Sequence, residues 1–240
     1  MMVLRSFLFN IAFIVWALVS SILFIPLFVI SSKTAMIAGP IWAHVAMLLA
    51  RIILGLRYEV RGREHIPDKP VIYASKHQSA WDTIIFLILF SNPAYVLKRE
   101  LLRLPGWGWY LWRMKMIAID RSAGASSIKK MIQQSKAALA DDRPIVIYPE
   151  GTRTAPGAEP HYHPGITALY SMLKTPVVPV ALNSGYFWGK NAFRKRSGKV
   201  IIEFLPAIDP GLNKETFSST LQNTIETASQ ALLEEAQSKE

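Results

Sequence analysis

The chain has 240 residues, a formal net charge of +10 and no cysteine. This length allows one substantial domain with an appendage, and the absence of cysteine excludes disulfides, thiolate metal sites and a cysteine nucleophile. The positive charge indicates an anionic partner, such as nucleic acid, a membrane surface or a phosphate-bearing substrate. Because residues 1–50 are strongly apolar, membrane and lipid phosphate are favoured over nucleic acid.

The N-terminal segment is apolar enough to enter a membrane. Residues 1–50 contain two charged side chains, Arg5 and Lys33, and no residue from 6 to 32 is charged. About 20 apolar residues, rising roughly 1.5 Å each, cross a hydrocarbon core of about 30 Å. Pro26 is expected to kink or end this helix. A signal peptide is the alternative, but its apolar region would be shorter and would end in a small-x-small cleavage site.

A second apolar stretch runs from Thr34 to Leu56, and we expect Gly39-Pro40 to interrupt it. It could return across the bilayer or lie shallowly in one leaflet. Basic residues near its end favour a cytoplasmic position for the remainder of the chain. These residues are Arg51, Arg57, Arg61 and Arg63. We therefore expect residues 1–56 to form a membrane-anchoring helical hairpin. Residues 57–240 would form the main domain, on the cytoplasmic face of the inner (plasma) membrane.

Strand-like and helix-like segments alternate through the main domain. Short apolar runs predict strands at Tyr58–Arg61, Val71–Ala74, Ala94–Lys98, Met116–Ile119, Ile145–Tyr148, Val177–Leu182 and Val200–Leu205. Apolar composition and periodicity predict helices over Trp81–Phe90, Ser126–Ala140 and residues 213–238. This alternation predicts an α/β fold with a mixed, mainly parallel sheet flanked by helices.

The first candidate site follows the strand predicted at 71–74. His77 enters a turn there, and Asp82 follows five residues later. On a continuous helix, residues five apart point roughly 140° away from each other. The two can meet only if His77 lies at or before the helix start and Asp82 lies in its first turn. Asp82 could then hold the Nδ1 proton of His77 and leave Nε2 as a general base. The alternative is a solvated histidine beside a helix-capping aspartate.

Cations at the ends of other predicted strands indicate a phosphate site. In open α/β sheets, ligands collect where strands end and loops begin. The segment Glu150-Gly151-Thr152-Arg153 combines a glycine for close approach, a hydroxyl and a guanidinium suited to bidentate phosphate binding. Lys98 and Arg121 stand at two further strand ends. Any one of these cations would usually form a surface ion pair, but together they favour a phosphate.

Four stretches resemble, in order and spacing, the motifs of glycerolipid acyltransferases. They are a His-x4-Asp block (His77, Asp82), a second block with Lys98, Glu100, Leu101, Ile119, Asp120 and Arg121 around Pro105-Gly106, the segment 150–153, and the turn Val178-Pro179-Val180. The resemblance spans about residues 58–205. One departure is Lys76, where many members of the family have asparagine. The resemblance implies a glycerolipid acyltransferase-like fold, with residues 57–240 as the catalytic domain.

The resemblance also implies a reaction. His77 Nε2 would deprotonate the sn-2 hydroxyl of 1-acyl-sn-glycerol 3-phosphate (lysophosphatidic acid), which attacks acyl-CoA or acyl carrier protein and yields phosphatidic acid. Lys98, Arg121 and the segment 150–153 would bind the phosphate, and Val178 and Pro179 would line the acyl pocket. We expect no metal and no cofactor, a bilayer with anionic lipids as partner, and no nucleic acid.

Three alternative functions stay open at this point. The acceptor could be another lysolipid, such as a lyso-ornithine lipid. The chain could instead hydrolyse acyl thioesters, or bind anionic lipid without catalysis.

Two further features have competing interpretations. His161 and His163 could form a metal pair, but no cysteine or third ligand stands at a recognisable spacing, so a lid or substrate-facing turn at Thr154–Pro164 is favoured. A dense aromatic cluster could belong to the core, an interfacial belt or the wall of an acyl tunnel. Its members are Trp107, Trp109, Tyr110 and Trp112.

Overall fold

The computed structural model describes residues 1–104, 106–120 and 123–238, except for the side chains of residues 32 and 33. Its helices are α1 (Met2–Leu23), α2 (Ile25–Ile30), α3 (Ser32–Leu49), α4 (Trp81–Leu89), α5 (Trp107–Arg113), α6 (Gly124–Ala140), α7 (Gly165–Leu173), α8 (Ser184–Phe187) and α9 (Lys214–Gln237). Shorter helical turns are η1 (Ala50–Leu54), η2 (Arg63–His65) and η3 (Arg99–Arg103). The strands are β1 (Leu56–Arg61), β2 (Ile72–Ser75), β3 (Ala94–Lys98), β4 (Ile117–Ile119), β5 (Ile145–Ile147), β6 (Val177–Leu182) and β7 (Gly198–Phe204).

The strands form one seven-stranded sheet in the order β1-β7-β6-β2-β5-β3-β4. The β6–β7 pair is antiparallel and all other pairs are parallel, which confirms the predicted mixed, mainly parallel sheet. Strand β2 lies at the centre, where Tyr73 pairs with Val146 of β5 and Val178 of β6. The chain therefore leaves β2 into the loop that carries His77 at the middle of the carboxyl edge, beside the ends of β5 and β6.

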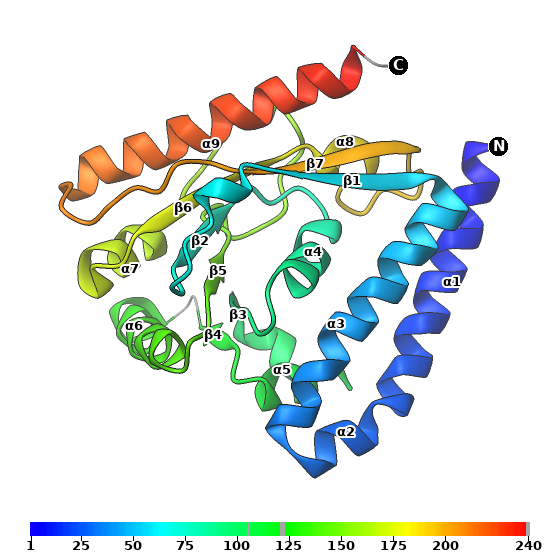
Figure 1. Cartoon of the computed structure of the whole chain (residues 1–240), viewed down its shortest axis with the longest axis horizontal. Helices are drawn as coiled ribbons and strands as arrows, with labels where there is room; N and C mark the ends of the chain where they lie inside the picture. Colours follow the sequence, from blue (N-terminus) through cyan, green and yellow to red (C-terminus); the bar gives the residue numbers. More distant parts are fainter. Residues whose placement is uncertain (105, 121–122, 239–240) are drawn as a thin grey trace.

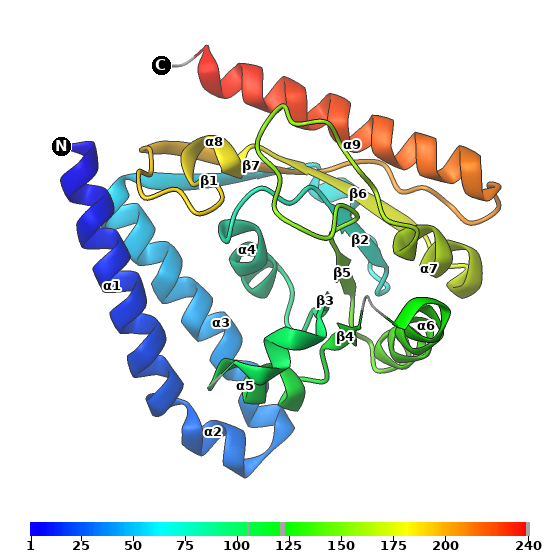
Figure 2. The same ribbon diagram turned by 180° about the vertical axis from the view of Figure 1, so that it is seen from behind.

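Helices cover both faces of this sheet (Figures 1 and 2). Tyr73 of β2 packs into the cluster formed with α4 and the N-terminal helices. Its neighbours Ile72 and Ala74 point the other way, into the cluster formed with α6, α7 and α9. Successive side chains of a strand face opposite sides of the sheet, so a strand buried on both faces reads as a continuous apolar run. This explains why β2, β5 and β6 have almost no polar residues.

Helix α9 shows how a mostly polar segment is held on the sheet. Asn213 accepts a hydrogen bond from the Thr216 backbone N–H at 2.8 Å and so caps the helix. Phe217, Leu221 and Ile225 repeat every four residues and are fully buried. This spacing places them on one face, which packs against the sheet beside β6 (Figure 1).

The N-terminal segment forms the predicted helical hairpin. Met2–Leu23 and Thr34–Leu54 are long and apolar enough to cross a membrane, judged by length and composition. Pro26 stands in the first turn of α2, directly after the break at Phe24, as predicted. Helix α3 packs on α4 of the main domain, whereas α1 exposes large apolar side chains along its length, including Leu4, Phe7, Ile14, Leu18 and Ile22.

The expected interruption at Gly39-Pro40 is wrong, because α3 runs through both residues. A proline inside a helix removes one backbone hydrogen bond and crowds the preceding turn. Tertiary packing compensates here, since α3 lies against α1, α2, α4 and α5. Gly39 allows the closest approach, to Tyr110 of α5, whose hydroxyl would lie 2.2 Å from a β-carbon at position 39.

Candidate active site

The loop from β2 to α4 brings the two predicted catalytic residues together. Helix α4 begins at Trp81, so His77 precedes the helix and Asp82 lies in its first turn. His77 Nδ1 lies 3.0 Å from Asp82 Oδ2. The helix starts at Trp81, as predicted, because residues 77–80 curl around the Asp82 carboxylate instead of forming helical turns.

The Asp82 carboxylate is fully buried and organises this loop. Its Oδ2 atom accepts the backbone N–H groups of Gln78 at 2.6 Å and Ser79 at 2.8 Å as well as the His77 contact. An ionised carboxylate only accepts hydrogen bonds, so the Nδ1 atom of His77 carries its proton. In the neutral imidazole Nε2 is then unprotonated and can act as a general base. The His77 side chain is 14% exposed.

Ser184 completes the surroundings of Asp82, and sequence reasoning missed it. Ser184 opens the short helix α8 directly after β6, and its Oγ donates to Asp82 Oδ1 at 2.5 Å. The next residue, Gly185, donates its N–H to Gln78 Oε1 at 3.0 Å. The available signal was a serine just past the strand predicted at 177–182, whose end lies at the carboxyl edge that also holds His77.

Tyr148 at the end of β5 supports the histidine ring. The two rings stack with centroids 4.0 Å apart and an interplanar angle of 21°. The Tyr148 hydroxyl donates to the Asp82 backbone carbonyl at 3.0 Å. Burial, with Tyr95 and the Asp82 charge nearby, raises the pKa of Tyr148. The phenol therefore stays protonated and keeps this bond, which fixes both members of the dyad.

A cavity of about 770 Å³ opens beside His77, a size typical of ligand sites. Its lining includes the polar residues Lys98, Asp120, Thr152 and Arg153. Its remaining walls are mostly apolar and include Trp42, Leu87, Leu97, Trp107, Tyr110, Leu111 and Met131. The cavity thus suits an elongated molecule with an anionic head and an apolar tail.

The aromatic cluster divides into cavity-lining and exposed residues. Trp107 and Tyr110 line the cavity, in agreement with a tunnel wall. Trp109 and Trp112 are exposed on the other side of α5, and their interfacial role stays a prediction.

Most of the predicted phosphate-binding residues line the cavity. Lys98, Gly151, Thr152 and Arg153 all do so, and the Arg153 guanidinium also lies 3.5 Å from Asn191 Oδ1. Gly151 has a φ of +64°, which favours glycine over other residues. The remaining candidate cation, Arg121, lies outside the described residues.

Three predicted site residues belong to the scaffold. Glu150 is 3% exposed and is absent from the cavity lining. Its carboxylate contacts Lys76 Nζ and Thr154 Oγ1, each at 2.7 Å, and a carboxylate would repel a phosphate. Val178 and Pro179 lie inside β6, buried beside β2, and line no part of the cavity. Their side chains pack within the sheet and its covering helices, so they do not contact a molecule held in this cavity.

His161 and His163 place their rings 5.3 Å apart and perpendicular to each other. Among the residues that the structure describes, no three His, Asp or Glu side chains gather as a metal site would require. His163 instead lines the cavity, as Arg153 does.

Comparisons with known proteins agree with this geometry. A sequence model of the family described as Acyltransferase matches residues 57–183. A 1-acyl-sn-glycerol-3-phosphate acyltransferase from Pseudomonas aeruginosa is 41% identical over 167 residues, which cover 70% of this chain and 65% of that protein. The alpha form from Ovis aries is 28% identical, over 80% of this chain and 68% of that one.

A solved structure is similar in fold. The 1-acyl-sn-glycerophosphate (LPA) acyltransferase PlsC from Thermotoga maritima superposes with a TM-score of 0.78 and 20% identity, over 97% of this chain and 98% of that one. The match includes the N-terminal helices as well as the sheet, because it covers nearly the whole chain.

Proposed function

The chain belongs to the acyltransferase family, and from this membership we propose that it transfers a fatty acyl group to the sn-2 hydroxyl of 1-acyl-sn-glycerol 3-phosphate, forming phosphatidic acid. The acyl donor is acyl-CoA or acyl carrier protein. The names of the relatives support this acceptor. The observation that carries the proposal is a His77–Asp82 dyad beside a cavity that is lined by Lys98 and Arg153 and by many apolar side chains.

The proposed reaction needs one base and one good leaving group. Nε2 of His77 removes the proton of the acceptor hydroxyl, and Asp82 stabilises the imidazolium that forms. The oxygen attacks the thioester carbonyl carbon, so that a C–O bond forms and the C–S bond breaks. The proton on His77 then passes to the departing thiolate, which leaves readily because a thiol has a pKa near roughly 8.5. We propose that no metal or cofactor takes part.

Binding residues align the hydroxyl with this base. Lys98, Thr152, Arg153 and the Gly151 backbone would hold the acceptor phosphate, together with Arg121 as the motif implies. Charge-assisted bonds from a guanidinium suit a phosphate monoester. Fixing the acceptor in this way converts a bimolecular encounter into an oriented one, which can contribute as much to the rate as the base. The apolar walls of the cavity would hold acyl chain.

The hairpin brings the site to its insoluble substrates. Exposed apolar residues on α1 support membrane association, and the arginines at 51, 57, 61 and 63 support a position on the cytoplasmic face. Anionic lipids in that leaflet would attract the basic domain.

A panel of acceptors tests this proposal. The full chain in mixed micelles would be given one acyl donor, either acyl-CoA or acylated acyl carrier protein. The acceptor would be lysophosphatidic acid, lysophosphatidylcholine or a lyso-ornithine lipid, and the products would be identified by mass. We expect phosphatidic acid to form fastest. Preference for the lyso-ornithine lipid would overturn the acceptor assignment, and free fatty acid released at the same rate without any acceptor would identify a thioester hydrolase instead.

A further inference from the structure

We propose that Glu226, on helix α9, is a positioning residue for His77 and acts through Lys76 and Glu150. Lys76 directly precedes His77 and is 2% exposed. Its Nζ lies 2.7 Å from Glu150 Oε1 and 2.7 and 2.9 Å from the two carboxylate oxygens of Glu226. This inference rests on the proposed function, because positioning His77 matters for a reaction in which His77 is the base.

Glu150 transmits the contact to both backbone polar groups of His77. Glu150 Oε2 accepts the His77 N–H at 3.2 Å. Its Oε1 accepts the Thr154 hydroxyl at 2.7 Å, and the Thr154 backbone N–H donates to the His77 carbonyl at 2.8 Å. The place of the His77 backbone therefore depends on where the Glu150 carboxylate lies, and Lys76 fixes that carboxylate.

The hydrogen-bond donors of the buried Lys76 ammonium explain why Glu226 is needed. A buried ammonium is costly unless it is paired and hydrogen-bonded, and Lys76 has two carboxylates as partners. Glu150 is almost fully buried, whereas the Glu226 side chain is 24% exposed. Without Glu226, the ammonium could turn from Glu150 toward water to satisfy its remaining donors. Glu226 thus holds Lys76 on Glu150 from the outer side.

Tyr162 in turn fixes Glu226. Its hydroxyl donates to Glu226 Oε1 at 2.9 Å. Burial, together with the charges of Glu226 and Glu150, raises the pKa of Tyr162, so the hydroxyl remains a donor. The network thus joins the β2–α4 loop, the loop after β5 and a helix near the C-terminus. The colours of Figure 1 show that β2 and α9 are far apart in the sequence, although α9 packs on β6, which is the neighbour of β2 in the sheet. Helix α9 also falls outside residues 57–183, which the family model matches.

The test compares Glu226→Ala, Glu226→Gln and the control Glu234→Ala in the full chain. Glu234 is an exposed residue of the same helix, bonded to Gln230. We expect Glu226→Ala to lower kcat by roughly 10- to 100-fold, the scale of a small misplacement of a catalytic group, with KM for lysophosphatidic acid unchanged. Glu226→Gln keeps a carbonyl acceptor for Lys76 and Tyr162, so it should recover most of the loss. Glu234→Ala should match the wild type.

A second measurement does not depend on turnover. The NMR signal of the His77 Nδ1 proton, assigned by its loss in His77→Ala, should shift or broaden in Glu226→Ala and stay unchanged in Glu226→Gln and Glu234→Ala. An unchanged signal together with an unchanged kcat in Glu226→Ala overturns the network. So does a fall in kcat that Glu226→Gln does not recover. If the wild type makes no phosphatidic acid, the proposed function fails, and the NMR comparison still decides whether Glu226 positions His77.

Discussion

Ser184 donates a hydrogen bond to the Oδ1 atom of Asp82, on the opposite side of the carboxylate from His77. Oδ1 of this fully buried carboxylate accepts the bond from Ser184, while Oδ2 accepts hydrogen bonds from His77 and from two backbone N–H groups. The plane of the carboxylate is thereby fixed, and with it the direction in which the His77 ring points. Helix α8, which follows β6, therefore belongs to the surroundings of the proposed catalytic dyad.

Replacing Ser184 by alanine should slow acyl transfer without unfolding the protein. A buried acceptor left without its donor costs about 1–3 kcal/mol, and we expect a fall in kcat of roughly tenfold from the misdirected dyad. Initial rates at saturating substrate measure it. Ser219→Ala is the control, because among the described residues the Ser219 hydroxyl bonds only to carbonyls of its own helix. Wild-type kcat in Ser184→Ala would show that the bond has no role in the reaction.

Replacing His77 by alanine should abolish acyl transfer. The ring supplies the one base that the proposed reaction uses, and the backbone contacts of residue 77 with Glu150 and Thr154 do not need the side chain. We therefore expect normal circular dichroism and normal flotation with lipid vesicles, with product below detection. His44→Ala, in helix α3, serves as the control. Near-normal acylation by purified His77→Ala would refute the assignment of the base.

Arg153→Ala and Lys98→Ala should weaken binding of the acceptor more than they slow catalysis. Hydrogen bonds to charged groups contribute about 1.5–3 kcal/mol, so KM for lysophosphatidic acid should rise roughly 10- to 100-fold in each variant. A lysolipid without a phosphate monoester should be much less affected. Arg103→Ala is a matched control, since Arg103 is exposed in η3 and does not line the cavity. Equal losses for both kinds of acceptor would remove the phosphate assignment.

Local pattern was sufficient for much of the fold and for the dyad. The apolar runs at β2, β5 and β6 are strands because both faces of the sheet are covered. The spacing from His77 to Asp82 required a helix start between them, and Trp81 provides it. Such features depend on a few neighbouring residues, so the sequence displays them directly.

The remaining features depend on which distant segments meet. Ser184 and Glu226 reach the site only because β6 lies beside β2 and α9 packs over that part of the sheet. Glu150 appeared to face a phosphate because its partner Lys76 is 74 positions away. Val178 and Pro179 are buried in the sheet because β6 lies between β7 and β2. The sequence does not show this order of strands, so it could not exclude the two residues from the acyl pocket. Helix α3 continues through Pro40 for the same kind of reason, since packing outweighs local propensity.

Protonation of Glu59 at low pH should lower the free energy of unfolding. A hydrogen bond from Lys199 is the main cause that lowers the pKa of Glu59 below its ordinary value, and a hydrogen bond from Arg61 lowers it further. A carboxyl group with a lowered folded-state pKa stabilises the fold fully above its unfolded value, and this stabilisation disappears as pH falls through the folded value. The melting temperature of Glu59→Gln should therefore be lower than that of the wild type at neutral pH. This difference should vanish well below pH 4.5, the ordinary pKa of the glutamate side chain. A difference that persists in strong acid would contradict this. High salt should also reduce the difference in melting temperature, because the ion pairs of Glu59 with Lys199 and Arg61 are accessible to solvent.

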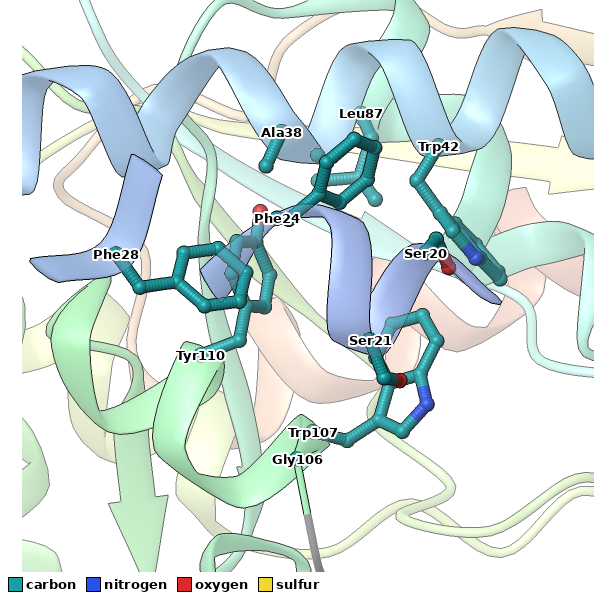
Figure 3. Close-up of a pocket in the computed structure, with 11 residues that line it drawn as sticks. Ser20, Ser21, Phe24, Phe28, Ala38, Trp42, Leu87, Gly106, Trp107 and Tyr110 are labelled. Carbon is teal, nitrogen blue, oxygen red and sulfur yellow. The ribbon is translucent and has the colours of Figure 1, made fainter. Parts of the chain in front are cut away.

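The contact between Gly39 and Tyr110 should decide how firmly the hairpin is held. These residues line a small cavity of about 30 Å³ between α1, α3 and α5 (Figure 3). The Tyr110 hydroxyl is buried there without a hydrogen-bond partner among the described residues. Alanine is favoured over glycine within a helix by about 1 kcal/mol. A β-carbon at position 39, however, would lie 2.2 Å from that hydroxyl, and overpacking costs about 1–3 kcal/mol.

These opposing effects predict that Gly39→Ala changes the melting temperature in opposite directions in the wild type and in Tyr110→Phe. Gly39→Ala alone should lower the melting temperature and speed proteolysis of the hairpin. Tyr110→Phe alone should be nearly neutral, since its hydroxyl leaves no described partner unsatisfied. In Tyr110→Phe the nearest atoms to the new β-carbon are the ring at 3.4 Å and Leu87 at 3.5 Å, close to ordinary contact. Adding Gly39→Ala to Tyr110→Phe should then raise the melting temperature. If alanine at 39 destabilises both backgrounds equally, the hydroxyl is not the obstacle and the hairpin is held by other contacts.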